Sequence, residues 1–146
     1  MMPQLVQRHF DENYYDEYRF ELSKNGFEKI GQGASRFGYK RGKTVIKVPY
    51  NSGGYSDCIM EAYVYRRFRR ADYCGMYFAP CRLLPNACLM MPYLERMNWD
   101  DVPMWAKRMD GGQCGRYKDR IVAYDSAYDI TSFKTQALEW AKVKRP

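Results

Sequence analysis

Apolar residues near the start of the chain recur every four positions: Phe10, Tyr14, Tyr18 and Leu22. This spacing places them on one side of a helix. Asp11 stands where an N-cap is expected, and Asn25-Gly26 is a typical helix end. The pattern therefore predicts an amphipathic helix between these two signals.

Short runs of β-branched and aromatic residues come next and predict three strands. Residues 27–30 lead into a glycine-rich turn at 31–33, and residues 36–40 continue beyond it. A tight turn at Arg41-Gly42 then gives residues 44–48, the most β-branched run in the chain. We expect these segments to form a hairpin followed by a further strand.

A glycine- and serine-containing stretch, residues 51–55, reads as a loop. Ser56 or Asp57 would then cap a helix that runs to about Ala71. On this helix Glu61 shares a stripe with apolar residues at helical spacing: Val64, Tyr65 and Phe68. A carboxylate on an apolar stripe is costly to bury without a partner, and Lys47 on the preceding strand is the candidate.

The second half of the chain alternates between short predicted elements. In order, they are strands at 78–84 and 87–91, an extended exit at 92–95, a helix from Asp100 to Met109, a hairpin of 113–117 with 120–124, and a helix that starts at Thr131 or Ser132. No linker is long enough to separate domains, and 146 residues suit one domain.

The cysteine and histidine content and the distribution of apolar residues limit the classes of protein to which the chain can belong. Five cysteines without a C-x-x-C pair, and a single histidine, argue against a zinc site and favour thiols packed as small core residues. No leader and no apolar run of membrane-spanning length opens or interrupts the sequence. We therefore expect a cytoplasmic protein of a reducing compartment, with no membrane partner.

The net charge of +7 favours a polyanionic partner: a nucleotide, a nucleic acid or an acidic protein surface. Much of the excess lies in two groups, Arg66, Arg67, Arg69 and Arg70, and Lys142, Lys144 and Arg145. A solvated helix face explains the arginine group equally well, so charge alone does not choose among these partners.

The order of the predicted elements resembles the N-terminal lobe of the protein-kinase-like superfamily. In that family a glycine-rich loop covers the nucleotide phosphates, and a strand lysine, held by a helix glutamate, contacts them. The resemblance assigns Gly31 and Gly33 to the loop, Lys47 to the lysine and Glu61 to its partner.

Two further positions follow from the resemblance. Residues 91–95 match the hinge, so Pro92 and Tyr93 are expected to meet the adenine through their backbone. Arg36 replaces the third loop glycine, where it would either reach a phosphate or block the loop from closing. The implied cofactors are ATP and Mg²⁺.

The second half resembles the family less closely, because the H-R-D-x-x-x-x-N catalytic loop is absent. Small kinase-like proteins encoded by tailed phages share this reduced pattern. The resemblance assigns Asp125 and Gln113 to the metal and leaves Asp110 as the local candidate for a catalytic base, with Asp129 as an alternative.

The predicted fold class is thus α+β: a kinase-like N-lobe, with an antiparallel sheet and one helix, and a strongly reduced C-lobe. Residues 1–26 form a helical extension, 27–95 the N-lobe, and 96–146 the reduced C-lobe and a basic helix. The favoured function is a pseudokinase that binds ATP and Mg²⁺ and acts on a protein partner, a host protein if the chain is phage-encoded. The alternatives are a minimal active phosphotransferase and a basic nucleic-acid-binding protein.

Overall fold

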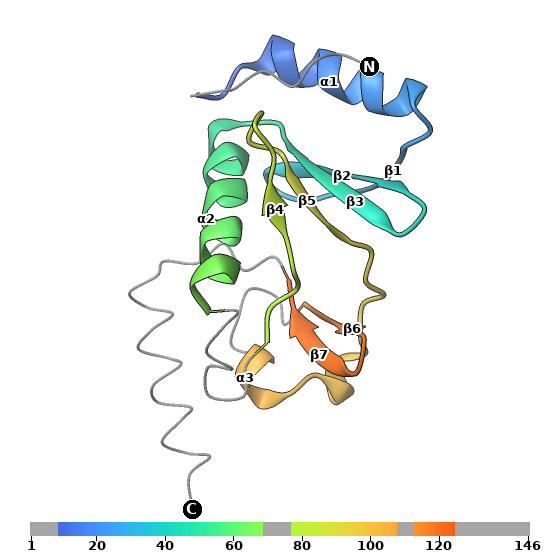
Figure 1. Cartoon of the computed structure of the whole chain (residues 1–146), viewed down its shortest axis with the longest axis vertical. Coiled ribbons are helices and arrows are strands. Elements are labelled where there is room, and N and C mark those ends of the chain that lie inside the picture. The colour runs from blue at the N-terminus through green and yellow to red at the C-terminus, as the bar shows by residue number, and fades with distance from the viewer. Residues whose placement is uncertain (1–8, 69–76, 108–112, 125–146) are drawn as a thin grey trace, which may run out of the picture. The chain divides into compact units, whose positions relative to one another are not determined.

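The structure, a computed structural model, describes residues 9–68, 77–107 and 113–124 (Figure 1). Contacts divide the described residues into two compact units. The first unit comprises the residues up to Ala62 together with Cys81–Tyr93, and the second comprises Tyr63–Pro80 and the residues from Leu94 on.

An antiparallel sheet of five strands is the framework of the first unit, in the order β1-β2-β3-β5-β4. The strands are β1 (Glu28–Gln32), β2 (Arg36–Arg41), β3 (Thr44–Pro49), β4 (Arg82–Leu83) and β5 (Leu89–Pro92). The mixed α+β class with an antiparallel sheet is confirmed. The tight turn lies one residue later than predicted, because Arg41 pairs with Thr44 and Gly42 takes a positive φ of 60°.

One face of this sheet packs against α1 (Glu12–Lys24). The predicted helix signals are confirmed: the Asp11 side chain accepts a hydrogen bond from the Tyr14 N–H at 3.2 Å, and Asn25 is the C-cap. The buried cluster combines helix and sheet residues: Tyr14, Tyr15, Tyr18 and Leu22 with Phe37, Tyr39, Ile46 and Val48. The predicted alternation in β3 therefore holds, since Ile46 and Val48 share this face.

The opposite face receives α2 (Ser52–Phe68), through a cluster of Cys58 and Ala62 with Leu89. This helix begins earlier than predicted. Asn51 caps it, because its Oδ1 accepts the Gly54 N–H at 2.8 Å. Residues 52–55 of the expected loop are therefore helical, and neither Ser56 nor Asp57 is the cap.

The second unit holds shorter elements: a 3₁₀ turn η2 (Trp99–Asp101), α3 (Met104–Lys107), β6 (Cys114–Tyr117) and β7 (Arg120–Ala123). The predicted hairpin is confirmed, with Lys118 at a positive φ of 54° in its turn. The strand predicted at 78–84 is wrong in extent. Only Arg82–Leu83 belong to the sheet, and Phe78 forms a parallel bridge to Ala123.

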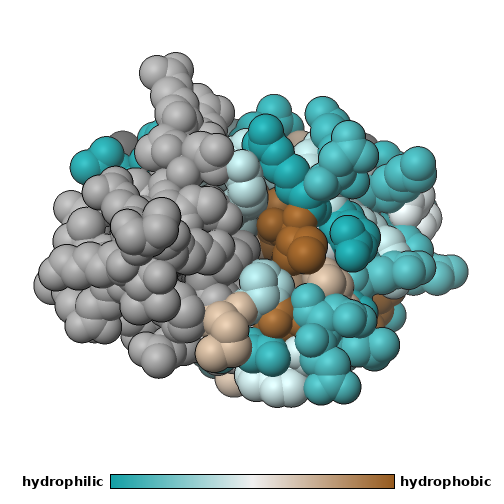
Figure 2. Space-filling view, turned by 90° about the horizontal axis from the view of Figure 1, so that it is seen from below, coloured by the Kyte–Doolittle hydropathy of each residue, from teal (hydrophilic) through white to brown (hydrophobic). Residues whose placement is uncertain are grey.

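The surface drawn in Figure 2 is mostly hydrophilic over the described residues, with a small apolar area between polar side chains. Among the helices that the structure describes, none has both the length and the apolar character needed to cross a membrane. The helix predicted from Thr131 or Ser132 lies outside the described residues.

Candidate functional site

Three charged side chains meet on the α2 face of the sheet. Lys47 lies on β3 and points away from Ile46 and Val48, which belong to the α1 face. Gly38 is its register partner on β2, so Arg36, two residues before Gly38, faces the same way. Glu61 reaches both cations from α2.

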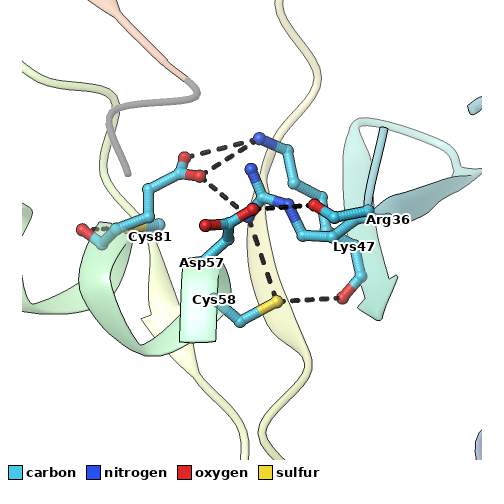
Figure 3. Close-up of polar contacts among 7 residues, drawn as sticks. Arg36, Lys47, Asp57, Cys58 and Cys81 are labelled. Carbon is cyan, nitrogen blue, oxygen red and sulfur yellow. Dashed lines mark hydrogen bonds and ion pairs between the residues drawn. The ribbon is translucent and has the colours of Figure 1, made fainter. Parts of the chain in front are cut away.

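Glu61 contacts both cations of this charged trio, of which Arg36 and Lys47 are labelled in Figure 3. Its Oε1 lies 2.9 Å from Arg36 Nη1 and 3.3 Å from Lys47 Nζ, and its Oε2 lies 3.4 Å from Lys47 Nζ. The side chains are 3% exposed for Glu61, 9% for Arg36 and 12% for Lys47. The predicted Lys47–Glu61 pair is confirmed as a contact, and Arg36 proves to share its carboxylate.

The trio carries a formal charge of +1 at one place on the sheet. A carboxylate that pins an ammonium and a guanidinium holds both cations in fixed positions, which is what recognition of a phosphate requires. Guanidinium also binds phosphate oxygens in a bidentate manner, so Arg36 adds a second donor type to Lys47. The residues present therefore fit a polyphosphate.

The glycine-rich turn is placed differently from the prediction. Gly31 and Gln32 pair with Gly38 and Phe37 as the last residues of β1. The chain reverses instead over residues 33–36, where the Gly33 N–H donates to the Arg36 carbonyl at 2.9 Å. Gly33 thus stands in the turn as predicted, whereas Gly31 lies in the strand before it.

Two thiols border the trio. The Cys58 thiol contacts Arg36 at 3.9 Å and the Lys47 carbonyl at 3.8 Å, and the Cys81 thiol donates to the Glu61 carbonyl at 3.7 Å (Figure 3). Burial raises the pKa of Cys58 to about 11 and that of Cys81 to about 12. Both groups therefore remain neutral thiols near pH 7 and are poor nucleophiles.

The raised pKa of Cys58 predicts a loss of stability at high pH. The folded state holds this proton more tightly than the unfolded chain, whose thiol titrates near 9.0. The stabilising contribution is complete below pH 9 and is lost as the pH rises to about 11. Between pH 7.5 and 10.5, urea unfolding should show that wild type loses roughly 2 kcal/mol more than Cys58→Ala. Equal losses in both proteins would contradict the assignment.

The predicted adenine contacts, Pro92 and Tyr93, lie at the end of β5 and just after it. Pro92 has no N–H, and the Tyr93 N–H donates to the Lys43 carbonyl at 2.8 Å. The Tyr93 ring is covered by Lys40, whose Nζ lies 4.0 Å from the ring centroid. Any adenine contact at these two residues would therefore use their carbonyl groups.

The remaining predicted residues are placed only in part. Gln113 precedes β6, and its carbonyl accepts the Tyr124 N–H at 3.0 Å, which closes the hairpin. Asp110, Asp125 and Asp129 lie outside the described residues. In the described ranges 9–68, 77–107 and 113–124, no group of three or more metal-binding side chains gathers in one place.

The hairpin, the lysine-bearing strand and the glutamate-bearing helix follow one another in the predicted order, and the Glu61 carboxylate meets Lys47. No protein-family model matches the chain, and no curated protein matches it in sequence. Among solved structures, the ternary complex of streptomycin, ATP and APH(2")-IIa aligns with it at 16% identity and a TM-score of 0.42. The alignment covers 66% of this chain and 33% of that chain, so the chain spans about a third of that structure.

Sequence reasoning missed the residues around the turn. Ser35 donates to Asp57 at 2.7 Å, Asn51 caps α2, and Gly54 lies against the turn. The Gly53-Gly54 pair inside a helix was the available signal, because glycine is costly there unless another backbone comes close.

Proposed function

We propose that this chain is a kinase-like domain that binds ATP with Mg²⁺ and acts through a protein partner rather than by phosphoryl transfer. One observation carries the proposal: the buried Glu61 carboxylate contacts both Lys47 and Arg36, and Arg36 is the last residue of the turn at residues 33–36. Such a fixed pair of cations suits the phosphates of a nucleotide.

Each predicted residue has a stated part in this proposal. Lys47 and Arg36 would contact the phosphates, with Glu61 positioning both, while Gly31 and Gly33 would let the backbone approach. The carbonyls of Pro92 and Tyr93 would accept the adenine amino group. Asp125 and Gln113 would hold Mg²⁺, although a glutamine oxygen is a weaker ligand for a hard cation than a carboxylate.

Binding is favoured over transfer because the sequence lacks the H-R-D-x-x-x-x-N loop that supplies a base and a metal ligand in the family. The spacing from Asp110 to Gln113 is two residues shorter than that pattern requires. A protein that keeps the nucleotide cations without this loop fits a binding role. The partner would be a host protein if the chain is phage-encoded.

A thermal-shift titration with ATP, with and without Mg²⁺, tests the proposal. At one hundred times the dissociation constant, ATP should add about 2.7 kcal/mol of apparent stability to wild type. We expect Lys47→Ala to abolish this shift and Lys43→Ala, a change at the neighbouring turn, to preserve it. No shift of wild type at millimolar ATP would refute nucleotide binding.

Two further assays on the wild-type protein distinguish the pseudokinase from the phosphotransferase and from the nucleic-acid-binding protein. If ATP binds, transfer of labelled phosphate to the chain itself or to added protein would establish a phosphotransferase. Binding of ATP without such transfer would establish a pseudokinase. The nucleic-acid alternative rests on the arginine group, of which Arg66 and Arg67 are exposed on α2. Binding of DNA or RNA that disappears at modest salt would indicate nonspecific charge.

A further inference from the structure

The turn at residues 33–36 touches the first turn of α2 directly. A Cβ atom added to Gly54 would lie 2.0 Å from the Ser35 carbonyl oxygen and 3.1 Å from the Pro49 Cα. Both obstacles are backbone atoms, which cannot move aside without a shift of the chain. Only glycine therefore allows the turn and the helix to approach this closely.

Hydrogen bonds hold the turn in this position through each of its first three carbonyls. The Tyr50 hydroxyl donates to the Gly33 carbonyl, Asn51 Nδ2 donates to the Ala34 carbonyl at 3.4 Å, and the Tyr50 N–H donates to the Ser35 carbonyl at 3.0 Å. The donors all come from the two residues that join β3 to α2.

Side-chain hydrogen bonds also join the turn at residues 33–36 to the start of α2. The Ser35 hydroxyl donates to Asp57 Oδ2 at 2.7 Å, one helical turn beyond Gly54 (Figure 3). Asn51 serves twice, because its Oδ1 caps α2 through the Gly54 N–H while its Nδ2 reaches the turn. The side chain that caps α2 thus also holds the turn.

We propose that residues 50–57 form a latch that fixes the turn on α2 and so positions the Arg36 guanidinium beside Glu61. The turn is then a rigid wall of the phosphate site rather than a lid that closes over a ligand. Tyr50, Asn51, Gly54 and Asp57 are positioning residues, and only their effect on ATP rests on the proposed function.

Hydrogen exchange of the Tyr50 amide tests the latch without any ligand, because this amide bonds to the turn. By helix propensity alone, Gly54→Ala would strengthen α2 and slow the exchange. With the latch, Gly54→Ala should speed exchange of this amide at least tenfold. Ser56→Ala is the matched control, since it raises helix propensity at an exposed position of α2. Slow exchange retained in Gly54→Ala would overturn the latch.

A milder pair of variants covers the case in which Gly54→Ala fails to fold. Ser35→Ala removes the bond to Asp57 and should speed Tyr50 exchange about threefold to tenfold while leaving the amides of the β3–β5 pair unchanged. Ser35→Thr keeps the hydroxyl and should restore the wild-type rate. Equal exchange in Ser35→Ala and wild type would overturn the role of this bond.

Titration with MgATP tests whether the latch affects nucleotide binding, separately from its effect on amide exchange. If wild type binds, Ser35→Ala should bind about threefold to tenfold more weakly and Ser35→Thr should recover the affinity. Unchanged affinity in Ser35→Ala, with faster exchange, would overturn the positioning role. If no protein binds ATP while exchange responds as expected, the latch stands and nucleotide binding fails.

Discussion

Glu61→Ala is expected to lower the free energy of unfolding by about 3–5 kcal/mol, the usual cost of breaking a buried ion pair from one side. The carboxylate is 3% exposed and lies between Arg36 and Lys47. Its removal takes away the carboxylate that both buried cations contact. Urea unfolding monitored by circular dichroism, at pH 7 and constant salt, measures the loss.

Lys47→Ala is the matched control for this prediction. Arg36 still contacts the Glu61 carboxylate at 2.9 Å in that variant, so the anion keeps a charged partner. We therefore expect Lys47→Ala to cost less than half of what Glu61→Ala costs. An equal or larger loss would show that Arg36 does not share the carboxylate. The expected survival of the fold is also what makes Lys47→Ala usable in the ATP titration.

The Lys47–Glu61 contact could be predicted because two local patterns define it. In β3 the alternation of Ile46 and Val48 with Lys47 assigns the lysine to the opposite face, and helical spacing puts Glu61 on the buried stripe of α2. The position of Arg36 could have been predicted from the same kind of alternation. Phe37 and Tyr39 alternate with it on β2, and the register with β3 places it on the face of Lys47.

The start of α2 could not be predicted in this way. Glycine lowers helix propensity by about 1 kcal/mol, so Gly53-Gly54 reads locally as a loop. What makes Gly54 necessary is the Ser35 carbonyl, which belongs to another turn of the chain. A contact between segments distant in sequence leaves no periodic pattern, and for the same reason the Ser35–Asp57 bond was not foreseen.

The extent of β4 could not be predicted from the apolar pattern either. Residues 78–84 are mostly apolar, yet only Arg82 and Leu83 pair with β5. Earlier in this segment, Phe78 bridges Ala123 and the Ala79 N–H donates to the Ala123 carbonyl at 2.8 Å. Apolar character predicts burial, but the competition between two pairing partners is decided by the tertiary structure.

Tyr15→Ala is expected to cost about 3–5 kcal/mol of folding free energy, as for other large buried aromatics truncated to alanine. The side chain is 1% exposed, stacks on Phe10 with ring centroids 5.5 Å apart, and belongs to the cluster that joins α1 to the sheet. Its hydroxyl donates to the Asn86 carbonyl at 2.6 Å, which ties α1 to the connection between β4 and β5. Because Ile46 and Val48 of this cluster flank Lys47, we expect α1 to support the strand that carries the trio.

Tyr15→Phe separates packing from hydrogen bonding in the same position. It keeps the ring and removes only the donor to a buried carbonyl, so it should cost about 1–3 kcal/mol. Phe20→Ala, at an α1 side chain that is largely exposed, should change stability little. Urea unfolding of the three variants at pH 7 gives the comparison. A loss below about 1 kcal/mol for Tyr15→Ala would mean that α1 does not pack on the sheet. A large loss would make α1 part of the structure on which the Lys47–Glu61–Arg36 site depends.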